Sequence, residues 1–223
     1  MIGNCSRALS PPNCGRENHV SRHNSVPGAN FMRQREEPSV CVGVLPLNRM
    51  VTIHWKAAGV PLENMARATG RFTGLMAKAL ARHGSGTAWL WTHENGKGGH
   101  CHLLAHVPKS LVPTLTKLQR RWLTTIAGKP YRVGVIHSRP IGGRLGLETS
   151  NPPLYEVNLD AALSYLLKGA SEKAAAAFQL EKLEPGGRII GKRCGTSQNI
   201  GVKARRTQTT SERRTIHEEP NDI

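Results

Sequence analysis

The sequence is short of carboxylates, of aromatic residues and of long apolar runs. Its 223 residues hold 31 Lys and Arg against 15 Asp and Glu, a formal net charge of +16, and only 4% are Phe, Trp or Tyr. So basic a balance favours a polyanionic partner, either nucleic acid or an anionic membrane. Because no apolar run could span a bilayer and the N-terminus has no signal-like apolar core, nucleic acid is the predicted partner and no membrane is expected.

The cysteines are too few and too scattered for a disulfide framework. Their number, five, is odd, and no two form a Cys-x-x-Cys pair. This excludes a small disulfide-stapled secreted domain and fits a reducing cytoplasm. A chain of this length with 38% apolar residues predicts one well-packed domain plus tails.

The two ends differ in composition from the middle. Residues 1–40 are rich in Pro, Gly and Asn and lack periodicity, which predicts a disordered leader. Residues 202–223 are polar and rich in Arg, which predicts a basic flexible tail. The folded, functional domain is therefore expected over residues 48–201.

Hydrophobic periodicity within this domain predicts alternating strands and helices. Period-two alternation predicts strands over 49–55, 89–94, 100–107 and 131–137. Three- and four-residue spacing predicts helices over 61–83, 109–127 and 171–182. A loop is expected over 139–153, followed by a helix over 159–168 that Asn158 caps. This order suits an α+β fold, with an antiparallel sheet flanked by helices.

A predicted hairpin brings metal-binding residue types together. Turn residues 95–99 separate its two strands, and His100 and His102 lie on one face of the second strand. Across the turn, either His93 or Glu94 lies within reach of the pair. Two imidazoles and a carboxylate are ligands of divalent ions, and three ligands leave positions open for substrate.

At this point the sequence resembles a known family. His100-Cys101-His102 is similar to the His-hydrophobic-His core of the HUH endonucleases, which nick single-stranded DNA, and residues 94–108 resemble plasmid and phage rolling-circle replication proteins. Residues 52–55, Thr-Ile-His-Trp, are similar to the first motif of these proteins. The resemblance implies a ferredoxin-like sheet with both histidines on a central strand. It also implies Mg²⁺ or Mn²⁺ as cofactor, for which Glu94 is a better third ligand than His93 because hard ions favour carboxylate oxygen.

Tyr165 is the predicted nucleophile. Lys168 lies three residues later, so the two side chains share a helix face, and an ammonium group would stabilise the phenolate. Tyr-x-x-Lys is similar to the third motif of single-tyrosine replication initiators. Tyr155 has no partner lysine, and Tyr131 falls in a predicted strand where packing is the simpler role.

The resemblance implies a reaction and its partners. Tyr165 would attack a scissile phosphate of single-stranded origin DNA, giving a 5′-phosphotyrosine and a free 3′-hydroxyl, and so initiate rolling-circle replication in a bacterial cell. Since 223 residues leave no room for a helicase domain, a host helicase would separate the strands. A relaxase, a transposase and a non-catalytic basic DNA-binding regulator remain the alternatives.

A glycine-rich basic segment follows the tyrosine motif. It lacks the order and spacing of a phosphate-binding P-loop. Its glycines would let backbone N–H groups approach phosphate, and five side chains could donate hydrogen bonds to it. A similar Gly-Lys-Arg-x-Gly-x-Ser segment follows the tyrosine in related replication proteins. The predicted DNA-binding residues are Arg188, Lys192, Arg193, Thr196 and Ser197.

Overall fold

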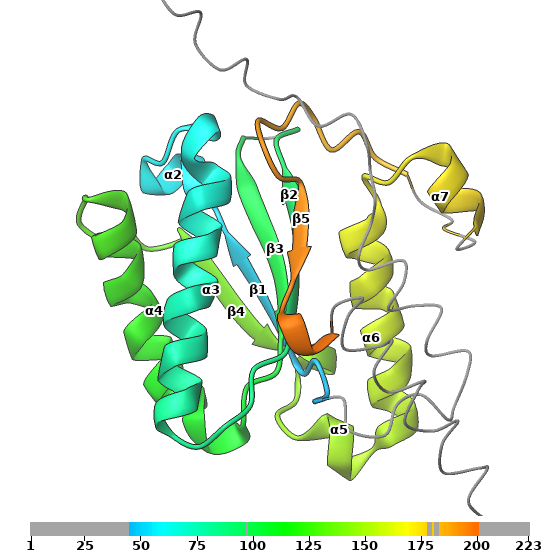
Figure 1. Ribbon diagram of the computed structural model, residues 1–223. Coiled ribbons are helices and arrows are strands. Elements are labelled where there is room, and N and C mark those ends of the chain that lie inside the picture. Colours follow the sequence, from blue (N-terminus) through cyan, green and yellow to red (C-terminus); the bar gives the residue numbers. More distant parts are fainter. Residues whose placement is uncertain (1–44, 97, 178–179, 181–182, 201–223) are drawn as a thin grey trace, which may run out of the picture.

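A five-stranded antiparallel sheet forms the centre of the molecule. The computed structural model describes residues 45–96, 98–177, 180 and 183–200; the leader predicted over 1–40 and the tail predicted over 202–223 lie outside this part. The sheet order is β4-β1-β3-β2-β5 (Figure 1). The strands are β1 (Arg49–Ile53), β2 (Trp89–Glu94), β3 (His100–Ala105), β4 (Ile136–Pro140) and β5 (Cys194–Thr196).

Helices cover both faces of the sheet. The helices are α2 (Trp55–Ala58), α3 (Met65–Arg82), α4 (Val112–Ala127), α5 (Leu147–Ser150), α6 (Pro152–Leu167) and α7 (Glu172–Ala177). α3 and α4 lie on one face and α6 on the other (Figure 1). The order β1-α3-β2-β3-α4-β4 is the β-α-β-β-α-β pattern of ferredoxin-like folds, extended by β5. The predicted α+β class is confirmed. Among the described helices, none has the length and apolarity to cross a membrane.

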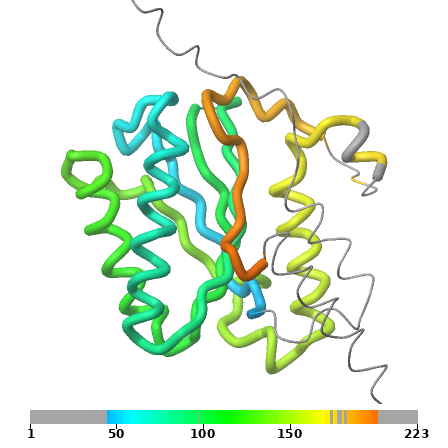
Figure 2. Tube along the Cα trace, viewed as in Figure 1, coloured from blue at the N-terminus to red at the C-terminus, as the bar shows by residue number. Residues whose placement is uncertain are grey.

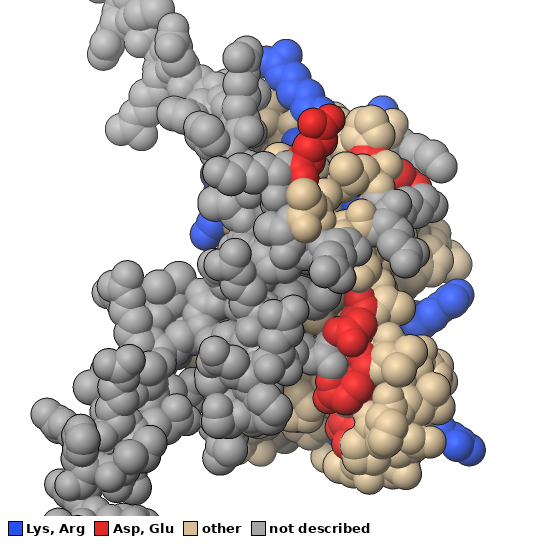
Figure 3. All heavy atoms as spheres, turned by 90° about the vertical axis from the view of Figure 1, so that its right-hand side faces the viewer, with Lys and Arg blue, Asp and Glu red and all other residues tan. Residues whose placement is uncertain are grey.

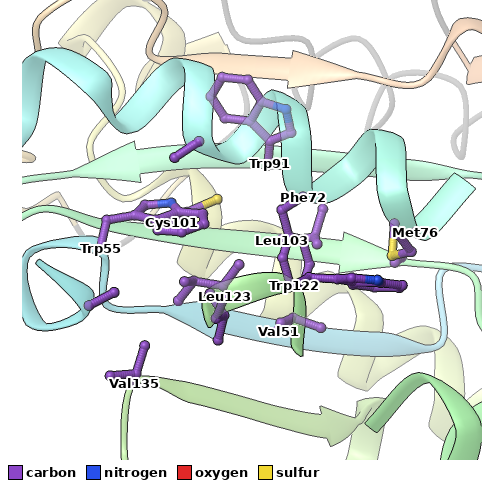
Figure 4. Packing of buried hydrophobic residues seen from close by; sticks show 14 of the residues in the cluster. Val51, Trp55, Phe72, Met76, Trp91, Cys101, Leu103, Trp122, Leu123 and Val135 are labelled. Carbon is purple, nitrogen blue, oxygen red and sulfur yellow. The ribbon is translucent and has the colours of Figure 1, made fainter. Parts of the chain in front are cut away.

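Side-chain alternation along the strands divides the core into two. On the face under α3 and α4, Leu103 of β3 and Val51 of β1 pack with Phe72 and Trp122, whose rings meet edge to face at 5.6 Å (Figure 4). On the other face, Leu104 packs against α5 and α6. Because successive strand residues point to opposite faces, β1, β2 and β3 each contribute side chains to both cores.

The first strand is shorter than predicted. β1 ends at Ile53, and Trp55 begins the short helix α2 instead of closing the strand. Trp55 is fully buried, and its indole Nε1 donates to the Thr69 hydroxyl at 2.8 Å. Because this ring packs under α3, the chain leaves the sheet after Ile53.

The fourth strand lies later in the chain than predicted. The prediction of 131–137 was wrong in its position, since β4 covers Ile136–Pro140 and pairs with β1. Val133 is 95% exposed and Gly134 has a positive φ of 86°, so the alternation that suggested a strand there belongs to a turn. Pro140 ends an edge strand, where a missing N–H is tolerated.

The predicted loop and helix boundaries after β4 were also wrong. α6 begins at Pro152, because Asn151 accepts a hydrogen bond from the Leu154 N–H and proline suits the first helical turn. Asn158, the predicted cap, lies inside the helix and donates to the Leu154 carbonyl. The helix predicted over 171–182 is present as α7, Glu172–Ala177; residues 178–179 and 181–182 lie outside the described part.

Candidate metal centre and active site

The pairing of β2 with β3 sets three potential metal ligands side by side. Glu94 stands directly opposite His100, and His102 is flanked by Thr92 on β2 and Thr52 on β1. One ligand atom from each of Glu94, His100 and His102 lies within 4.8 Å of the others. β3 is the middle strand of the sheet, so the two histidines project from a strand that is hydrogen-bonded on both sides. The hairpin predicted from the sequence is confirmed.

Each histidine is oriented by a second group. The Nδ1–H of His100 donates to the Gly98 carbonyl at 2.6 Å, which turns its Nε2 toward Glu94 at 3.3 Å. The Thr52 hydroxyl lies 3.1 Å from Nδ1 of His102, so a proton on that nitrogen leaves Nε2 free to face Glu94. Metal-bound histidines are held in this way, with the distal nitrogen hydrogen-bonded and the other one free.

Two buried polar atoms at the centre favour a bound cation. Within the described residues, Glu94 Oε1 and His102 Nε2 have no hydrogen-bond partner, and the 3.5 Å from His102 Nε2 to Glu94 Oε2 is too long to supply one. Leaving such an atom buried and unpaired costs about 1–3 kcal/mol. Burial also lowers the pKa of His102, which keeps its imidazole neutral and able to ligate. The group therefore fits a divalent metal ion, with two nitrogens and a carboxylate as ligands.

Lys168 holds the carboxylate of this group. Its Nζ lies 3.2 Å from Oε2 of Glu94 and 3.2 Å from Oε2 of Glu184. Burial alone would lower the pKa of Lys168, but Tyr165 and the two carboxylates outweigh it and raise the pKa. Burial alone would raise the pKa of Glu94, but the two imidazoles and Lys168 hold it well below its ordinary value. Both side chains are therefore charged at neutral pH.

His93 belongs to the other face of the sheet. Its Nε2 lies 2.8 Å from the Thr69 hydroxyl, its Nδ1 donates to the Lys192 carbonyl at 2.9 Å, and its ring packs against Trp91 with centroids 4.3 Å apart. Burial lowers the pKa of His93 to about 4, so it stays neutral. The geometry thus places Glu94, and not His93, beside the histidine pair.

Tyr165 projects from the last turn of α6 into the same site. Its ring meets the ring of His102 edge to face, with centroids 4.9 Å apart, and Nζ of Lys168 lies 4.1 Å from its centre. Tyr165 remains 41% exposed, so its hydroxyl can be reached by a substrate. The three-residue spacing brings tyrosine and lysine together as a helix face requires.

The other two tyrosines serve packing. Tyr155 is buried, and its hydroxyl donates to the Leu47 carbonyl at 3.1 Å. Tyr131 lies between α4 and β4, outside any strand, and the Arg120 guanidinium covers its ring at 5.5 Å. Neither lines the cleft that contains Tyr165.

A segment before β5 fixes the end of β2 from outside. The Asn95 N–H donates to the Gly186 carbonyl at 2.8 Å, and the Asn95 side chain donates to the Arg188 carbonyl at 3.0 Å. Gly187 has a φ of +69°, and a Cβ there would lie 2.7 Å from the Asn95 carbonyl carbon, so only glycine fits. The segment passes over the tip of the hairpin before β5 runs beside β2 (Figure 2). It holds the Glu94 end of β2 in place.

The predicted DNA-binding residues lie on this segment and on β5, in different environments. Arg188 and Lys192 are exposed, and Thr196 is half-buried at the end of β5. Arg193 is half-buried and donates to the Gly187 carbonyl at 2.7 Å. The Ser197 hydroxyl is buried between the Trp89 N–H and the Asn199 side chain. Arg193 and Ser197 therefore brace the β2 edge, while contact with DNA remains a prediction for all five.

An open cleft of about 1140 Å³ surrounds the site. It runs between α6 and the strands, and its lining includes cationic and imidazole side chains that sequence reasoning did not single out: His54, His137 and Arg139. The rings of His54 and His100 lie 5.6 Å apart, as do those of His54 and His137. The alternation of Met50, Thr52 and His54 along the first strand was a usable signal for this face.

Glu184 and Thr52 are the other residues that sequence reasoning missed. Thr52 stood within the first motif, but its contact with His102 depends on the pairing of β1 with β3. Glu184 lies 16 positions after Lys168 and reaches it only because the chain folds back, as the hydrogen bond from the Glu184 N–H to the Lys168 carbonyl shows. No local pattern pointed to it.

Comparison with protein-family models, curated proteins and solved structures gives no match to this chain.

Proposed function

We propose that the protein is a metal-dependent, single-tyrosine nickase of the HUH type, which cuts and rejoins single-stranded DNA and initiates rolling-circle replication of a plasmid or phage-like element. The observation that carries the proposal is the contact of Tyr165 with His102, together with Lys168 lying between Tyr165 and Glu94. A nucleophile, a cation and a ligand set for a divalent ion converge in one cleft.

In this proposal Glu94, His100 and His102 hold Mg²⁺ or Mn²⁺, which would polarise the scissile phosphate. Tyr165 gives up its hydroxyl proton to solvent as it attacks, with the Lys168 ammonium beside its ring. The phenolate oxygen attacks phosphorus, the bond to the 3′ oxygen breaks, and that oxygen leaves as a hydroxyl after taking up a proton. The 5′ end stays joined to Tyr165, and the reverse reaction reseals the strand without ATP.

The shape and polarity of the cleft support a polymeric, anionic substrate. At about 1140 Å³ it is larger than most small-molecule pockets, and it is open to solvent. Arg139 lines the cleft, as does Lys168, which pairs with Glu94 and Glu184, and the exposed Arg188 and Lys192 lie on the segment over the hairpin. Strand separation by a host helicase belongs to the same proposal.

The test is formation of a covalent protein–DNA adduct. The full chain is incubated with Mn²⁺ and single-stranded oligonucleotides drawn from a library of origins, and the products are resolved on denaturing gels. We expect an adduct that chelation prevents and that maps to Tyr165. Tyr165→Phe should lose it, whereas Tyr131→Phe, the same chemical change outside the cleft, should retain it.

The competing function is a basic DNA-binding regulator whose metal centre is structural. That protein would bind DNA with wild-type affinity and give no adduct with any oligonucleotide, and neither chelation nor Tyr165→Phe would change its affinity. A nickase should also keep most of its affinity in Tyr165→Phe, since phosphate contacts supply it, but it alone forms the covalent product.

A further inference from the structure

The outer sides of α3 and α4 carry cations and no carboxylate. All seven of their Lys and Arg side chains are exposed, and together they form what we term the basic face: Arg67, Arg71, Lys78, Arg82, Lys117, Arg120 and Arg121. Between Asn64 and Leu147 the only carboxylate in the sequence is Glu94, which lies across the sheet in the cleft. No acidic side chain of either helix neutralises this face.

The four cations of α3 form a straight stripe. They follow one another at intervals of four, seven and four residues. At 3.6 residues per turn these intervals keep all four within an arc of about 60°, and from Arg67 to Arg82 the helix rises about 22 Å. Gly74 falls within the stripe and adds no side chain, which leaves the helix backbone open to close approach.

The cations of the basic face have almost no partners among the described residues. In the part of the chain that the structure describes, none of them forms an ion pair, and only Arg120 has a side-chain partner, the ring of Tyr131. Arg67 and Arg71 also line a pocket of about 140 Å³ between the start of α3 and the end of α4. Seven like charges on neighbouring helices repel one another, so an anionic partner would relieve that repulsion.

We infer that the basic face binds the phosphate backbone of double-stranded nucleic acid. Single-strand binding relies on exposed aromatic rings on which bases stack, and α3 and α4 expose none. A membrane surface would require large exposed apolar side chains beside the cations, and those of the described chain all lie outside α3 and α4. A rigid duplex, recognised through its phosphates and without regard to sequence, matches a straight row of cations.

The helices on the opposite side of the sheet, unlike α3 and α4, carry carboxylates. Figure 3 looks onto the side that carries α6 and shows acidic side chains there beside a few basic ones. α5, α6 and α7 contribute the carboxylates of Glu148, Glu156, Asp160 and Glu172. α6 itself has no Lys or Arg. Because α6 contributes no cation, its outer side attracts a polyanion less than the basic face does.

This duplex surface goes beyond the proposed nicking and does not depend on it. The sheet separates the basic face from the cleft, so a duplex could stay bound to α3 and α4 while a single strand occupies the cleft. If no adduct forms in the nicking assay, the duplex surface is still testable. If the protein does not bind a duplex, the proposed nicking reaction is not contradicted.

The experiment compares two double variants of the full chain with the same loss of charge. Arg71→Gln/Lys78→Gln removes the middle of the stripe, and Lys109→Gln/Arg144→Gln removes two exposed cations outside the basic face and outside the cleft. Affinity for a fluorescent duplex of roughly 20 base pairs, for a single strand of the same length and for phosphatidylserine vesicles is measured across salt concentrations. Thermal melting confirms that both variants are folded.

Loss of the stripe should weaken duplex binding about tenfold or more at low salt and flatten the slope of log affinity against log salt by about 1.8, or 0.9 for each lost phosphate contact. The control should keep the wild-type duplex affinity and slope, and adduct formation should be unchanged in both variants. Equal losses in the stripe variant and the control would overturn the inference. So would an equal loss of single-strand affinity, or lost vesicle binding with duplex binding intact.

Discussion

The two helical layers cover opposite faces of the same sheet, but they carry different side chains toward solvent and toward the strands. α3 and α4 are basic outside and apolar inside, with Phe72 and Trp122 packed over β1 and β3. α6 carries no Lys or Arg, and its last turn sets Tyr165 against His102. One layer is a packed support with a charged outer surface. The other closes a cleft and brings a potential nucleophile to the sheet.

The same contrast holds for neighbouring residues of one strand. On β2, His93 points under α3, where it is buried and hydrogen-bonded at both nitrogens. Glu94 points toward α6, where one oxygen has no partner among the described residues. Satisfied polar groups on one face and an unsatisfied one on the other distinguish a packed core from a site prepared for a ligand.

Replacing one histidine on each face of the sheet should give the largest difference between the two faces. His102→Ala takes away a buried ligand atom, and we expect Mn²⁺ affinity and adduct formation to fall by about 100-fold or more. Loss of a residue that only hydrogen-bonds to a metal ligand lowers affinity by about 10- to 100-fold, and loss of the ligand itself should cost at least as much. His93→Gln, on the α3 face, should change Mn²⁺ affinity only slightly. Calorimetric titration of both variants measures this, and equal losses would refute the assignment of ligands.

Acid should destabilise the metal-free protein through the α3 face. The pKa of His93 falls from 6.5 in the unfolded chain to about 4 in the fold, so between these values the unfolded state binds more protons and stability decreases as pH falls. From about pH 7 to about pH 5 we expect a loss of roughly 2 kcal/mol, which is about a 30-fold change in the folding equilibrium.

Glu94 should add nothing to this loss. Its lowered pKa gives stability that is present above the ordinary carboxyl pKa and is lost only on stronger acidification. Urea unfolding in chelator at the two pH values measures the total loss, to which His102 adds because burial lowers its pKa as well, and His93→Gln should remove roughly 2 kcal/mol of it. A pH dependence that is unchanged in His93→Gln would contradict the assignment to His93.

Matched Thr→Val substitutions should sharpen the contrast between the faces. Thr52→Val removes the hydroxyl next to Nδ1 of His102, and we expect Mn²⁺ affinity to fall roughly tenfold because the imidazole loses its orientation. Thr73→Val removes a hydroxyl that donates to the Thr69 carbonyl inside α3, and it should leave Mn²⁺ affinity unchanged. Electron paramagnetic resonance of free Mn²⁺ gives both values.

The smallest expected effect has the opposite sign. Lys168→Met removes an ammonium 3.2 Å from Glu94 Oε2, so Mn²⁺ should bind several-fold more tightly, roughly fivefold, since a competing positive charge is gone. In the proposed reaction adduct formation should nevertheless fall, because the ammonium beside the Tyr165 ring is gone. Lys78→Met on the basic face is the control and should alter neither quantity. Weaker Mn²⁺ binding in Lys168→Met would show that the lysine supports the site and does not compete with the ion.

Local patterns were sufficient for the elements that carry the site. The turn residues 95–99 and the alternation on either side predict the β2–β3 hairpin, and strand periodicity alone places His100 and His102 on one face. The three-residue step from Tyr165 to Lys168 likewise follows from helix geometry. The predicted boundaries were wrong at two places. β1 ends before Trp55 because this ring is buried in the core, and α6 starts earlier because Asn151 caps it.

The sequence by itself determined the α+β class, the hairpin with its Glu/His/His residue types, the tyrosine–lysine pair and the excess of positive charge. These depend on spacing and composition, which the chain carries locally. The tertiary structure alone decided that Glu94 and not His93 faces the histidines, that Thr52 orients His102 and that Glu184 shares Lys168. It also placed the cations of α3 beside those of α4. Strand register and the return of distant segments bring these groups together, and no local interval in the chain encodes such contacts.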